Sequence, residues 1–337
     1  MGPLQLVVPL WEVFGAGTCG RYLLHEFDRS GIVWWDRVPG DEGLIDEDTQ
    51  KIVDRRHRAL ERDIDIALIQ FGGVDLGVQS QFRGQPNVGY IFSENRPLTP
   101  EQVKGLMGFD VLVAGSEWNA QVIRETGRAC MAVPQGVDSQ RFRPMRAVRE
   151  DDRFVIYSAG QWHHRKAQDL VIKAVRVAQQ RHHDIWLHAS WSNIWTQENG
   201  RAEAAGLRVV HFPILPHELL AREMNYTDLG LFPNRYEGGT NLLLMEYMAC
   251  GKPVIANVST GQADVMDRSA GIPIEGSDED LVEQMIEGIE FFYHDRGALK
   301  AAGEGARWEM LNWPWSRTAA GIWEACTSVK SCDSIPT

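Results

Sequence analysis

The stretch from Asp228 to Asn257 constrains the fold of this chain more than any other. Apolar runs at residues 228–233 and 253–257 flank a glycine loop and an apolar segment of helical length at residues 240–250. This order predicts a strand, a helix and a second strand that lies parallel to the first. Open sheets of this kind bind ligands at the carboxyl ends of their strands, where the glycine loop lies. The stretch therefore predicts both a fold class and the place of a site.

The residues of this loop and helix favour a particular kind of ligand. Gly238 and Gly239 allow backbone to approach a ligand closely, and Thr240 is predicted to be the N-cap of the helix. The backbone amides of the next residues then suit an anion. Glu246 lies in an apolar helix, where a carboxylate needs hydrogen-bond donors. The hydroxyl groups of a sugar or a ribose are such donors.

Apolar runs and helical segments alternate along the whole chain, which predicts an α/β protein. At 337 residues it has room for two domains. We expect two doubly wound Rossmann-like domains facing a cleft, at residues 1–145 and 146–313, with a terminal helix at 314–330 packing back on the first. The polar stretch 138–152 is the expected linker. Strands are expected at residues 4–9, 31–35, 64–71, 88–92, 110–114, 129–133, 154–159, 185–189, 207–212, 228–232, 253–257 and 271–274.

A second glycine pattern lies near the N-terminus. Residues 15–20 have the spacing G-x-G-x-x-G, and Asp36 follows a predicted strand, as in dinucleotide sites. Residues 10–14, however, separate the glycines from the first strand, and the standard pyrophosphate turn is shorter. Three interpretations stay open: a nicotinamide site, a loop that approaches another ligand, and a purely structural turn.

Two basic residues follow the first strand of the second domain. Arg165 and Lys166 stand just before a predicted helix, at the same end of the sheet as the loop at Gly238. Two cations beside backbone amides suit a diphosphate, although most such pairs are only solvated charge. Their position beside the glycine loop favours the diphosphate interpretation.

Other candidate ligand residues are weaker. The pairs His163-His164 and His182-His183 have no carboxylate or cysteine at ligand spacing, so no metal site is predicted. Trp162, Trp191 and Trp195 follow strands of the second domain, where each could contact a sugar or belong to the core.

Composition limits the partners and the compartment. A net charge of −12 argues against nucleic acid as the main partner. Five scattered cysteines favour free thiols in a reducing compartment. The sequence shows neither a signal-peptide pattern nor a run of about 18 apolar residues. We therefore expect a cytoplasmic protein without a transmembrane segment, with peripheral membrane contact left open.

Several motifs of the second domain occur together in one known family. In order along the chain, these are residues 160–170, 211–220, 226–234, 237–256 and 313–315. They resemble the retaining GT-B glycosyltransferases of family 4, also called glycosyl transferases group 1. The resemblance implies a GT-B fold and metal-independent transfer of a sugar, with retained configuration, from a nucleotide-diphosphate sugar to a hydroxyl acceptor. It implies no cofactor, and the acceptor can be a glycan, a natural product, a protein or a lipid-linked molecule.

The same resemblance suggests roles for individual residues. Lys166 and Arg165 would contact the diphosphate, Glu246 the ribose, and Glu237 the donor sugar. Phe212 and Ile214 would edge the nucleobase, and Gly15 and Gly17 would approach the phosphates and the acceptor. The expected donor-binding set is completed by Gln161, Gly238, Gly239, Thr240, Asn241 and Leu242.

The chain departs from the family pattern at three places. Gln161 stands five residues before Lys166, where the family usually has arginine. The spacing from Glu237 to Glu246 is one residue longer than usual. The extra residue would shift Glu237 and keep the helix, so the sugar contact of Glu237 is less secure than the ribose contact of Glu246. No residue can be assigned as a catalytic base from the sequence. Alternative functions are a sugar-nucleotide epimerase of the same fold, an oxidoreductase using Gly15 to Gly20, and a sugar-nucleotide sensor without activity.

Overall fold

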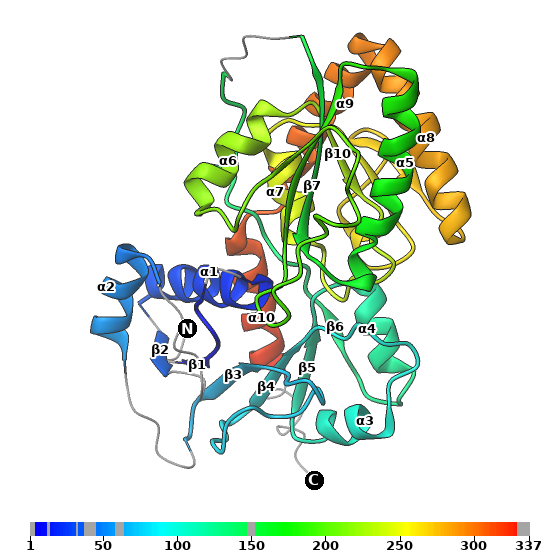
Figure 1. Ribbon diagram of the computed structural model, residues 1–337. Helices are drawn as coiled ribbons and strands as arrows, with labels where there is room; N and C mark the ends of the chain where they lie inside the picture. The colour runs from blue at the N-terminus through cyan, green and yellow to red at the C-terminus, as the bar shows by residue number, and fades with distance from the viewer. Residues whose placement is uncertain are drawn as a thin grey trace. The chain divides into compact units, whose positions relative to one another are not determined.

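Each apolar run that was predicted to be a strand contributes to a parallel sheet in the computed structural model (Figure 1). The structure describes residues 4–11, 14–31, 33–36, 45–57, 64–146 and 152–328. The chain divides into two units, residues 1–136 with 315–337 and residues 137–314, so the units divide nine residues before the expected boundary at 145. Within the described residues, each unit holds one six-stranded sheet, which confirms the predicted α/β class.

The first unit has the strand order β2-β1-β3-β4-β5-β6, and all of its strand pairs are parallel. Its strands are β1 (Leu4–Val7), β2 (Val33–Asp36), β3 (Ala67–Phe71), β4 (Asn87–Ile91), β5 (Val111–Ala114) and β6 (Met131–Ala132). Its helices are α1 (Gly15–Arg29), α2 (Glu47–Arg56), α3 (Pro100–Leu106), α4 (Glu117–Arg124) and α10 (Trp315–Ser328).

The terminal helix α10 packs on the first unit. The ring of Trp315 stacks on Tyr22 of α1, with ring centroids 5.1 Å apart. The hydroxyl of Thr318 donates a hydrogen bond of 2.9 Å to the carbonyl of Pro134. These contacts make α10 part of the first unit although it follows the second unit in the sequence.

The N-terminal glycines lie inside α1 and not in a turn before it. A Cβ atom at Gly17 would lie 1.8 Å from the carbonyl oxygen of Trp11, and one at Gly20 would lie 2.1 Å from that of Pro9. The backbone at residues 9–11 therefore crosses the helix so closely that only glycine fits. This packing favours the structural interpretation of the pattern, and the side chain of Asp36 lies outside the described part of the chain.

The second unit has the strand order β12-β11-β10-β7-β8-β9, again with parallel pairs. Its strands are β7 (Phe154–Gln161), β8 (Ile185–Ser192), β9 (Val209–His211), β10 (Leu229–Phe232), β11 (Val254–Asn257) and β12 (Gly271–Ile274). Its helices are α5 (Gln168–Arg181), α6 (His217–Tyr226), α7 (Leu242–Ala249), α8 (Asp278–His294) and α9 (Arg296–Met310), with short 3₁₀ turns η1 (His164–Lys166) and η2 (Gly261–Asp264).

Two apolar clusters sandwich the second sheet. One contains buried residues of α5 and α8, such as Leu170, Val175 and Ile289, and the other contains those of α6 and α7, such as Met224 and Tyr247. Figure 1 shows α5 and α8 on one face of this sheet, with α6 and α7 on the other. Because both faces are covered, the central strands β10 and β11 are fully buried, whereas the edge strand β9 is half-buried.

The stretch expected to be a linker is packed in its described part. Phe142 is fully buried in the core of the second unit. Asn225 holds the neighbouring backbone, because its side chain accepts from the amide of Met145 at 2.7 Å and donates to the carbonyl of Arg143 at 3.0 Å. Residues 138–146 therefore belong to the second unit, and residues 147–151 lie outside the described residues.

Two further expectations concern thiols and membranes. Cys19, Cys130, Cys250 and Cys326 are buried free thiols, and Cys332 lies outside the described residues. Within the described ranges, every helix is too short or too polar to cross a bilayer.

Candidate functional site

The strand order of the second unit fixes where a ligand can bind. The chain runs outward from β7 through β8 to β9, then returns to β10 on the other side of β7 and continues to β11 and β12. The loops that leave β7 and β10 therefore diverge in opposite directions, and doubly wound sheets bind ligands at such a switch point. The loop after β7 carries Arg165 and Lys166. The loop after β10 carries Glu237, Gly238 and Gly239.

Glu237 joins the two loops through one carboxylate oxygen. Lys166 Nζ lies 2.5 Å from Glu237 Oε2, Arg165 lies 3.4 Å from it, and Asn234 Nδ2 donates to it at 2.8 Å. None of these three contacts uses Oε1. The side chains of Lys166 and Glu237 are each only 11% exposed, so their attraction is weakly screened by water. The structure thus brings together the three residues predicted to be catalytic.

The surroundings keep Glu237 ionised. Burial by itself raises the pKa of this carboxyl group. The charges of Lys166 and Arg165 and the hydrogen bonds from Lys166 and Asn234 outweigh burial, so the pKa lies below its ordinary value of 4.5. Two cations therefore contact one oxygen of a single buried carboxylate.

Arg235 holds the cationic turn η1 in place. Its guanidinium group binds Asp169 through two hydrogen bonds of 2.9 and 2.8 Å and Asp278 through two more of 2.9 and 2.7 Å. It also donates to the carbonyl of His164 at 2.6 Å, and its amide donates to the carbonyl of Arg165 at 2.8 Å. The pKa of Arg235 is raised, because these carboxylate hydrogen bonds outweigh the effect of partial burial. Sequence reasoning missed Arg235, although it stands two residues before Glu237.

The start of α7 differs from the prediction. The helix begins at Leu242, its N-cap is Asn241, and Thr240 is fully buried with its hydroxyl 3.0 Å from the sulfur of Met245. Asn241 makes no side-chain hydrogen bond to the helix, because its amide group donates to Gln262 at 2.8 Å. A missing side-chain cap leaves the first amides of a helix open to an anion.

This helix start lies close to Lys166. A Cβ atom at Gly160, whose φ is +128°, would lie 3.8 Å from both Leu243 Cδ1 and Lys166 Cδ. The first turn of α7 and the stem of Lys166 therefore meet at the same glycine. An anion at the helix start would be within reach of the lysine.

Gly261 and Gln262 of η2 hold the loop that carries Glu237. Sequence reasoning missed both residues. A Cβ atom at Gly261 would lie 1.9 Å from the carbonyl oxygen of Gly239, and the Gly261 amide donates to the carbonyl of Glu237 at 3.0 Å. Gln262 is fully buried and donates to the carbonyls of Phe232 and Asn257 at 3.0 and 2.8 Å. Residues 237–239 are thus held by a close backbone packing that needs glycine.

The remaining donor-binding candidates lie in several surroundings. Glu246 is 5% exposed within α7, and Gly238 and Gly239 are buried in the loop before it. Gln161 ends β7, where its carbonyl accepts a hydrogen bond of 2.7 Å from Gln168. Ile214 is 40% exposed and Phe212 is half-buried, both after β9. Gly15 and Gly17 belong to the first unit, and their ligand contacts stay predictions.

The three candidate tryptophans differ in how far they are exposed to solvent. Trp191 is a core residue, since it is 2% exposed and donates to Ser158 at 3.2 Å. Trp162 is half-buried against the same core, and Trp195 is 67% exposed. Of the three, Trp195 is thus the most accessible to a ligand.

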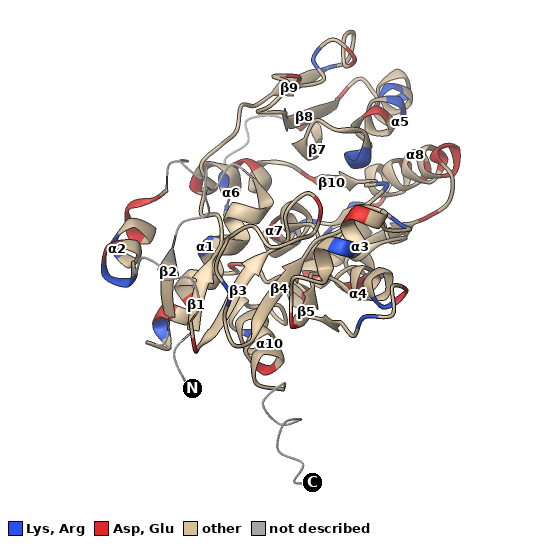
Figure 2. Cartoon of the chain, turned by 90° about the horizontal axis from the view of Figure 1, so that it is seen from below, with Lys and Arg blue, Asp and Glu red and all other residues tan. Residues whose placement is uncertain are grey.

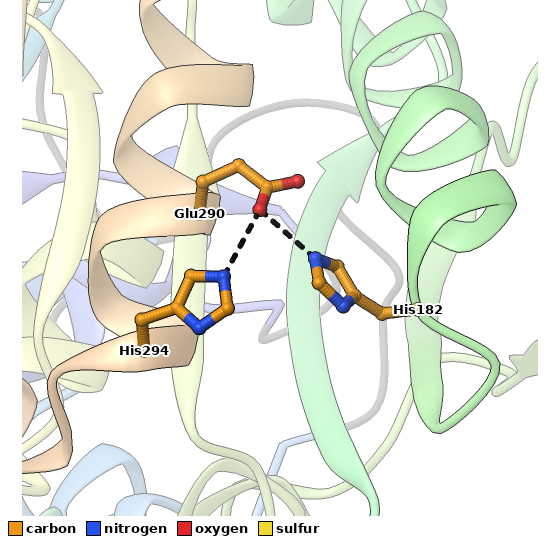
Figure 3. Close-up of side chains that lie close together, drawn as sticks. All are labelled: His182, Glu290 and His294. Carbon is orange, nitrogen blue, oxygen red and sulfur yellow. Dashed lines mark hydrogen bonds and ion pairs between the residues drawn. The ribbon is translucent and has the colours of Figure 1, made fainter.

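Of the histidine pairs 163–164 and 182–183, the second contains a residue, His182, whose partners are not evident from the sequence. His182, at the end of α5, lies beside Glu290 and His294 of α8 (Figure 3). His182 and Glu290 are 108 residues apart in the sequence, so ligand spacing could not reveal them. His163, by contrast, accepts a hydrogen bond of 3.3 Å from the amide of Arg165 and so caps η1.

Comparison with known proteins identifies the family. The model of the family described as "Glycosyl transferases group 1" matches residues 139–308, half of the chain. The chain therefore belongs to this glycosyltransferase family, as the motifs suggested. The match covers both loops of the candidate site.

Two curated relatives are similar at the sequence level. The chain is 28% identical over 211 residues to a GDP-mannose-dependent alpha-(1-6)-phosphatidylinositol monomannoside mannosyltransferase of Mycolicibacterium smegmatis, covering 57% of this chain and 54% of that protein. It is 28% identical over 202 residues to a GDP-mannose-dependent monoacylated alpha-(1-6)-phosphatidylinositol monomannoside mannosyltransferase of Corynebacterium glutamicum, covering 54% and 52%. The matched part thus spans about half the length of these curated relatives.

A solved structure supports the fold. An alpha,alpha-trehalose 6-phosphate synthase of Burkholderia multivorans matches with a TM-score of 0.71 at 12% identity, over 99% of this chain and 100% of that one. Identity this low shows the fold alone, and the fold is the two-sheet GT-B architecture that the sequence predicted.

Arg235→Lys tests how the site is held. Lysine keeps the charge but has only three donors, whereas the side chain of Arg235 makes five hydrogen bonds and binds both carboxylates in a bidentate manner. We expect the free energy of unfolding to fall by about 1.5 to 3 kcal/mol, the usual worth of a hydrogen bond to a charged group, and amides of residues 164–167 to exchange hydrogen faster. Urea denaturation and hydrogen-exchange mass spectrometry measure both effects. Arg222→Lys, at an exposed position of α6, is the control, and equal behaviour of the two variants would contradict the role of Arg235.

Proposed function

We propose that this protein is a retaining glycosyltransferase that moves a sugar from a nucleotide-diphosphate sugar to a hydroxyl acceptor. The observation that carries the proposal is the convergence of Lys166 and Arg165 on Glu237, at the switch point of the second sheet and beside the start of α7. Family membership supports the reaction class. The arrangement matches the chemistry of a diphosphate leaving group.

Lys166, Arg165 and the first amides of α7 would stabilise the departing nucleoside diphosphate. Breaking the bond to the sugar places negative charge on the leaving phosphate, and donors fixed beforehand lower the barrier by meeting that charge. Arg235 and Asn234 restrain Arg165, Lys166 and Glu237 before substrate binds. The cations supply the charge stabilisation that a metal ion gives in other transferases, so we propose metal-independent transfer.

Glu237 and Glu246 would divide the recognition of the donor. Glu237 uses Oε2 for its three hydrogen-bond and ion-pair partners, and Oε1 would accept a hydrogen bond from a sugar hydroxyl. Glu246 would bind the ribose hydroxyls. Because Lys166 is shared between Glu237 and the diphosphate, the sugar and the leaving group would be held by one connected set of charges.

Retention requires that the acceptor approach from the side on which the diphosphate leaves. In such a front-face substitution through an oxocarbenium-like state, the bond to the leaving oxygen breaks as the acceptor oxygen bonds to the anomeric carbon. The leaving phosphate accepts the proton of the acceptor hydroxyl. No protein nucleophile or separate base is needed, which suits a site whose carboxylate, Glu237, is occupied by cations.

We propose GDP-mannose as the donor and a glycan or glycolipid hydroxyl as the acceptor. Both curated relatives are named as GDP-mannose-dependent enzymes that act on phosphatidylinositol mannosides, and this supports the choice. A thermal-shift comparison of GDP-mannose with UDP-glucose, ADP-glucose and a dTDP-sugar tests the donor directly. A larger shift with any other donor would overturn GDP-mannose while leaving the reaction class intact.

Lys166→Ala should reduce kcat/KM for the donor by about 10- to 100-fold, because a hydrogen bond to a charged group is worth about 1.5 to 3 kcal/mol. Initial rates of GDP-mannose consumption at subsaturating donor measure this. Lys173→Ala, at an exposed position on α5, is the matched control and should keep its activity. The thermal midpoint of each variant separates lost function from lost fold. Equal rates for Lys166→Ala and the wild type would refute the phosphate role.

The stereochemistry and metal requirement can be tested together. NMR of the purified product should show the same anomeric configuration as the donor, and initial rates should be unchanged in excess EDTA. A product of opposite configuration would refute the retaining mechanism. Loss of activity in EDTA, with recovery on adding Mg²⁺ or Mn²⁺, would refute metal independence.

A further inference from the structure

A cluster of two histidines and a glutamate lies at the ends of α5 and α8, outside the site described above. Glu290 Oε2 is 2.9 Å from His182 Nε2 and 3.5 Å from His294 Nε2, and the three ligand atoms all lie within 4.8 Å of one another. Figure 3 shows both rings directed toward this carboxylate oxygen. We propose that His182, Glu290 and His294 bind one divalent transition-metal ion of the Zn²⁺ type.

The distances fit this class of ion. Bonds of about 2.0 to 2.2 Å from Zn²⁺ to imidazole nitrogen and carboxylate oxygen place tetrahedral ligand atoms roughly 3.3 to 3.5 Å apart. Of the two separations from Glu290 Oε2, the 3.5 Å to His294 lies within this range and the 2.9 Å to His182 lies somewhat below it. His294 is two-thirds exposed, so its ring can rotate and adjust the remaining distance, which is the one between the ring nitrogens of His182 and His294.

The elements supply the ligands in a favourable arrangement. Glu290 and His294 are four residues apart on α8 and so share one face of the helix, a spacing suited to binding one ion. His182 is the C-cap of α5, which packs against α8 along the same apolar cluster. A bound ion would therefore connect two helices, and open positions on the exposed side would be filled by water.

Neighbouring residues already orient two of the ligands. Arg181 donates to Glu290 Oε1 at 3.2 Å, which leaves Oε2 as the oxygen that faces both histidines. The ring of Tyr293 packs on His182, with centroids 4.0 Å apart. Outer contacts of this kind fix ligand orientation in known metal sites.

The charge around the cluster attracts cations. Arg181 and Glu290 also line a groove of about 700 Å³ between α5 and α8, whose charged lining consists of five carboxylates and two cations. Figure 2 shows the acidic residues of α8 in red and the basic residues of α5 in blue. An excess of carboxylates raises the local concentration of cations. The two imidazoles then favour Zn²⁺, Ni²⁺ or Cu²⁺ over Mg²⁺, which prefers oxygen ligands.

The proposed ion would act on stability and not on the chemistry of transfer. Helix α5 has 14 residues and begins after Lys166, so about 21 Å of helix separates its two ends. At the other end of the same helix pair, Arg235 already links Asp169 of α5 to Asp278 of α8. A metal at His182 would connect α5 and α8 a second time.

Isothermal titration calorimetry with Zn²⁺ tests the proposal on the full chain after removal of metal by chelator. We expect one strong equivalent in the wild type, at least about tenfold weaker binding in His294→Ala, and unchanged binding in the control His183→Ala, an exposed neighbour of His182. His294 is exposed, so its replacement leaves the fold intact. Zn²⁺ at about ten times its Kd should raise the Tm of the wild type by about 3 to 6 °C.

Cobalt gives an independent measurement. Co²⁺ added to the metal-free wild type should produce visible absorption bands of a nitrogen- and oxygen-coordinated ion, and His294→Ala should not produce them. Absence of stoichiometric Zn²⁺ binding, or equal affinity in the wild type and His294→Ala, would overturn the proposal. Either result would leave a hydrogen-bonded cluster only, and neither would affect the proposed sugar transfer.

Discussion

The buried ion pair between Lys166 and Glu237 is the interaction on which the arrangement of the second unit's site depends. Two charges removed from water are costly unless their remaining hydrogen-bonding capacity is satisfied. Here Asn234 and Arg165 share the same carboxylate oxygen, and the hydroxyl of Thr260 accepts from the amide of Glu237 at 3.1 Å. The pair therefore binds together the loops of two neighbouring strands, β7 and β10. A site formed in this way is fixed before its ligand arrives.

Arg235 extends the same restraint to the helices behind the site. By binding Asp169 and Asp278, it joins the starts of α5 and α8 to the turn that carries Lys166. Because both helices share one apolar cluster with the sheet, their positions cannot change independently of it. The cationic turn, the carboxylate and the helix start of α7 thus keep a fixed geometry, which is what electrostatic catalysis requires.

Much of this could be predicted from the sequence, and the failures have physical causes. Alternating apolar runs predicted both sheets, and position at the same end of the second sheet predicted that Lys166 would lie near the loop that carries Glu237. The N-cap was wrongly assigned to Thr240, because its hydroxyl turns to Met245 and the chain adopts the cap one residue later. The polar stretch around Phe142 resembled a linker because it has no periodic apolar face, but the buried ring of Phe142 and the distant side chain of Asn225 hold it in place.

Other features were invisible because they join distant parts of the chain. Arg235 is surrounded by polar loop residues, and only the fold brings Asp169 and Asp278 to it. His182 and Glu290 are 108 residues apart, and nothing local to either one indicates the other. The glycine pattern near the N-terminus could not be interpreted from the sequence alone, since close packing of the helix against residues 9–11 demands glycine at Gly17 and Gly20 just as a dinucleotide motif does.

We infer that the loops after β7 and β10 form the diphosphate site. Hydrogen-exchange mass spectrometry of the full chain, with and without saturating GDP, tests it most directly. With GDP bound, we expect slower exchange at residues 160–167 and 238–245 and no change in α10. Unchanged exchange in both loops, or protection confined to residues 14–20, would contradict it.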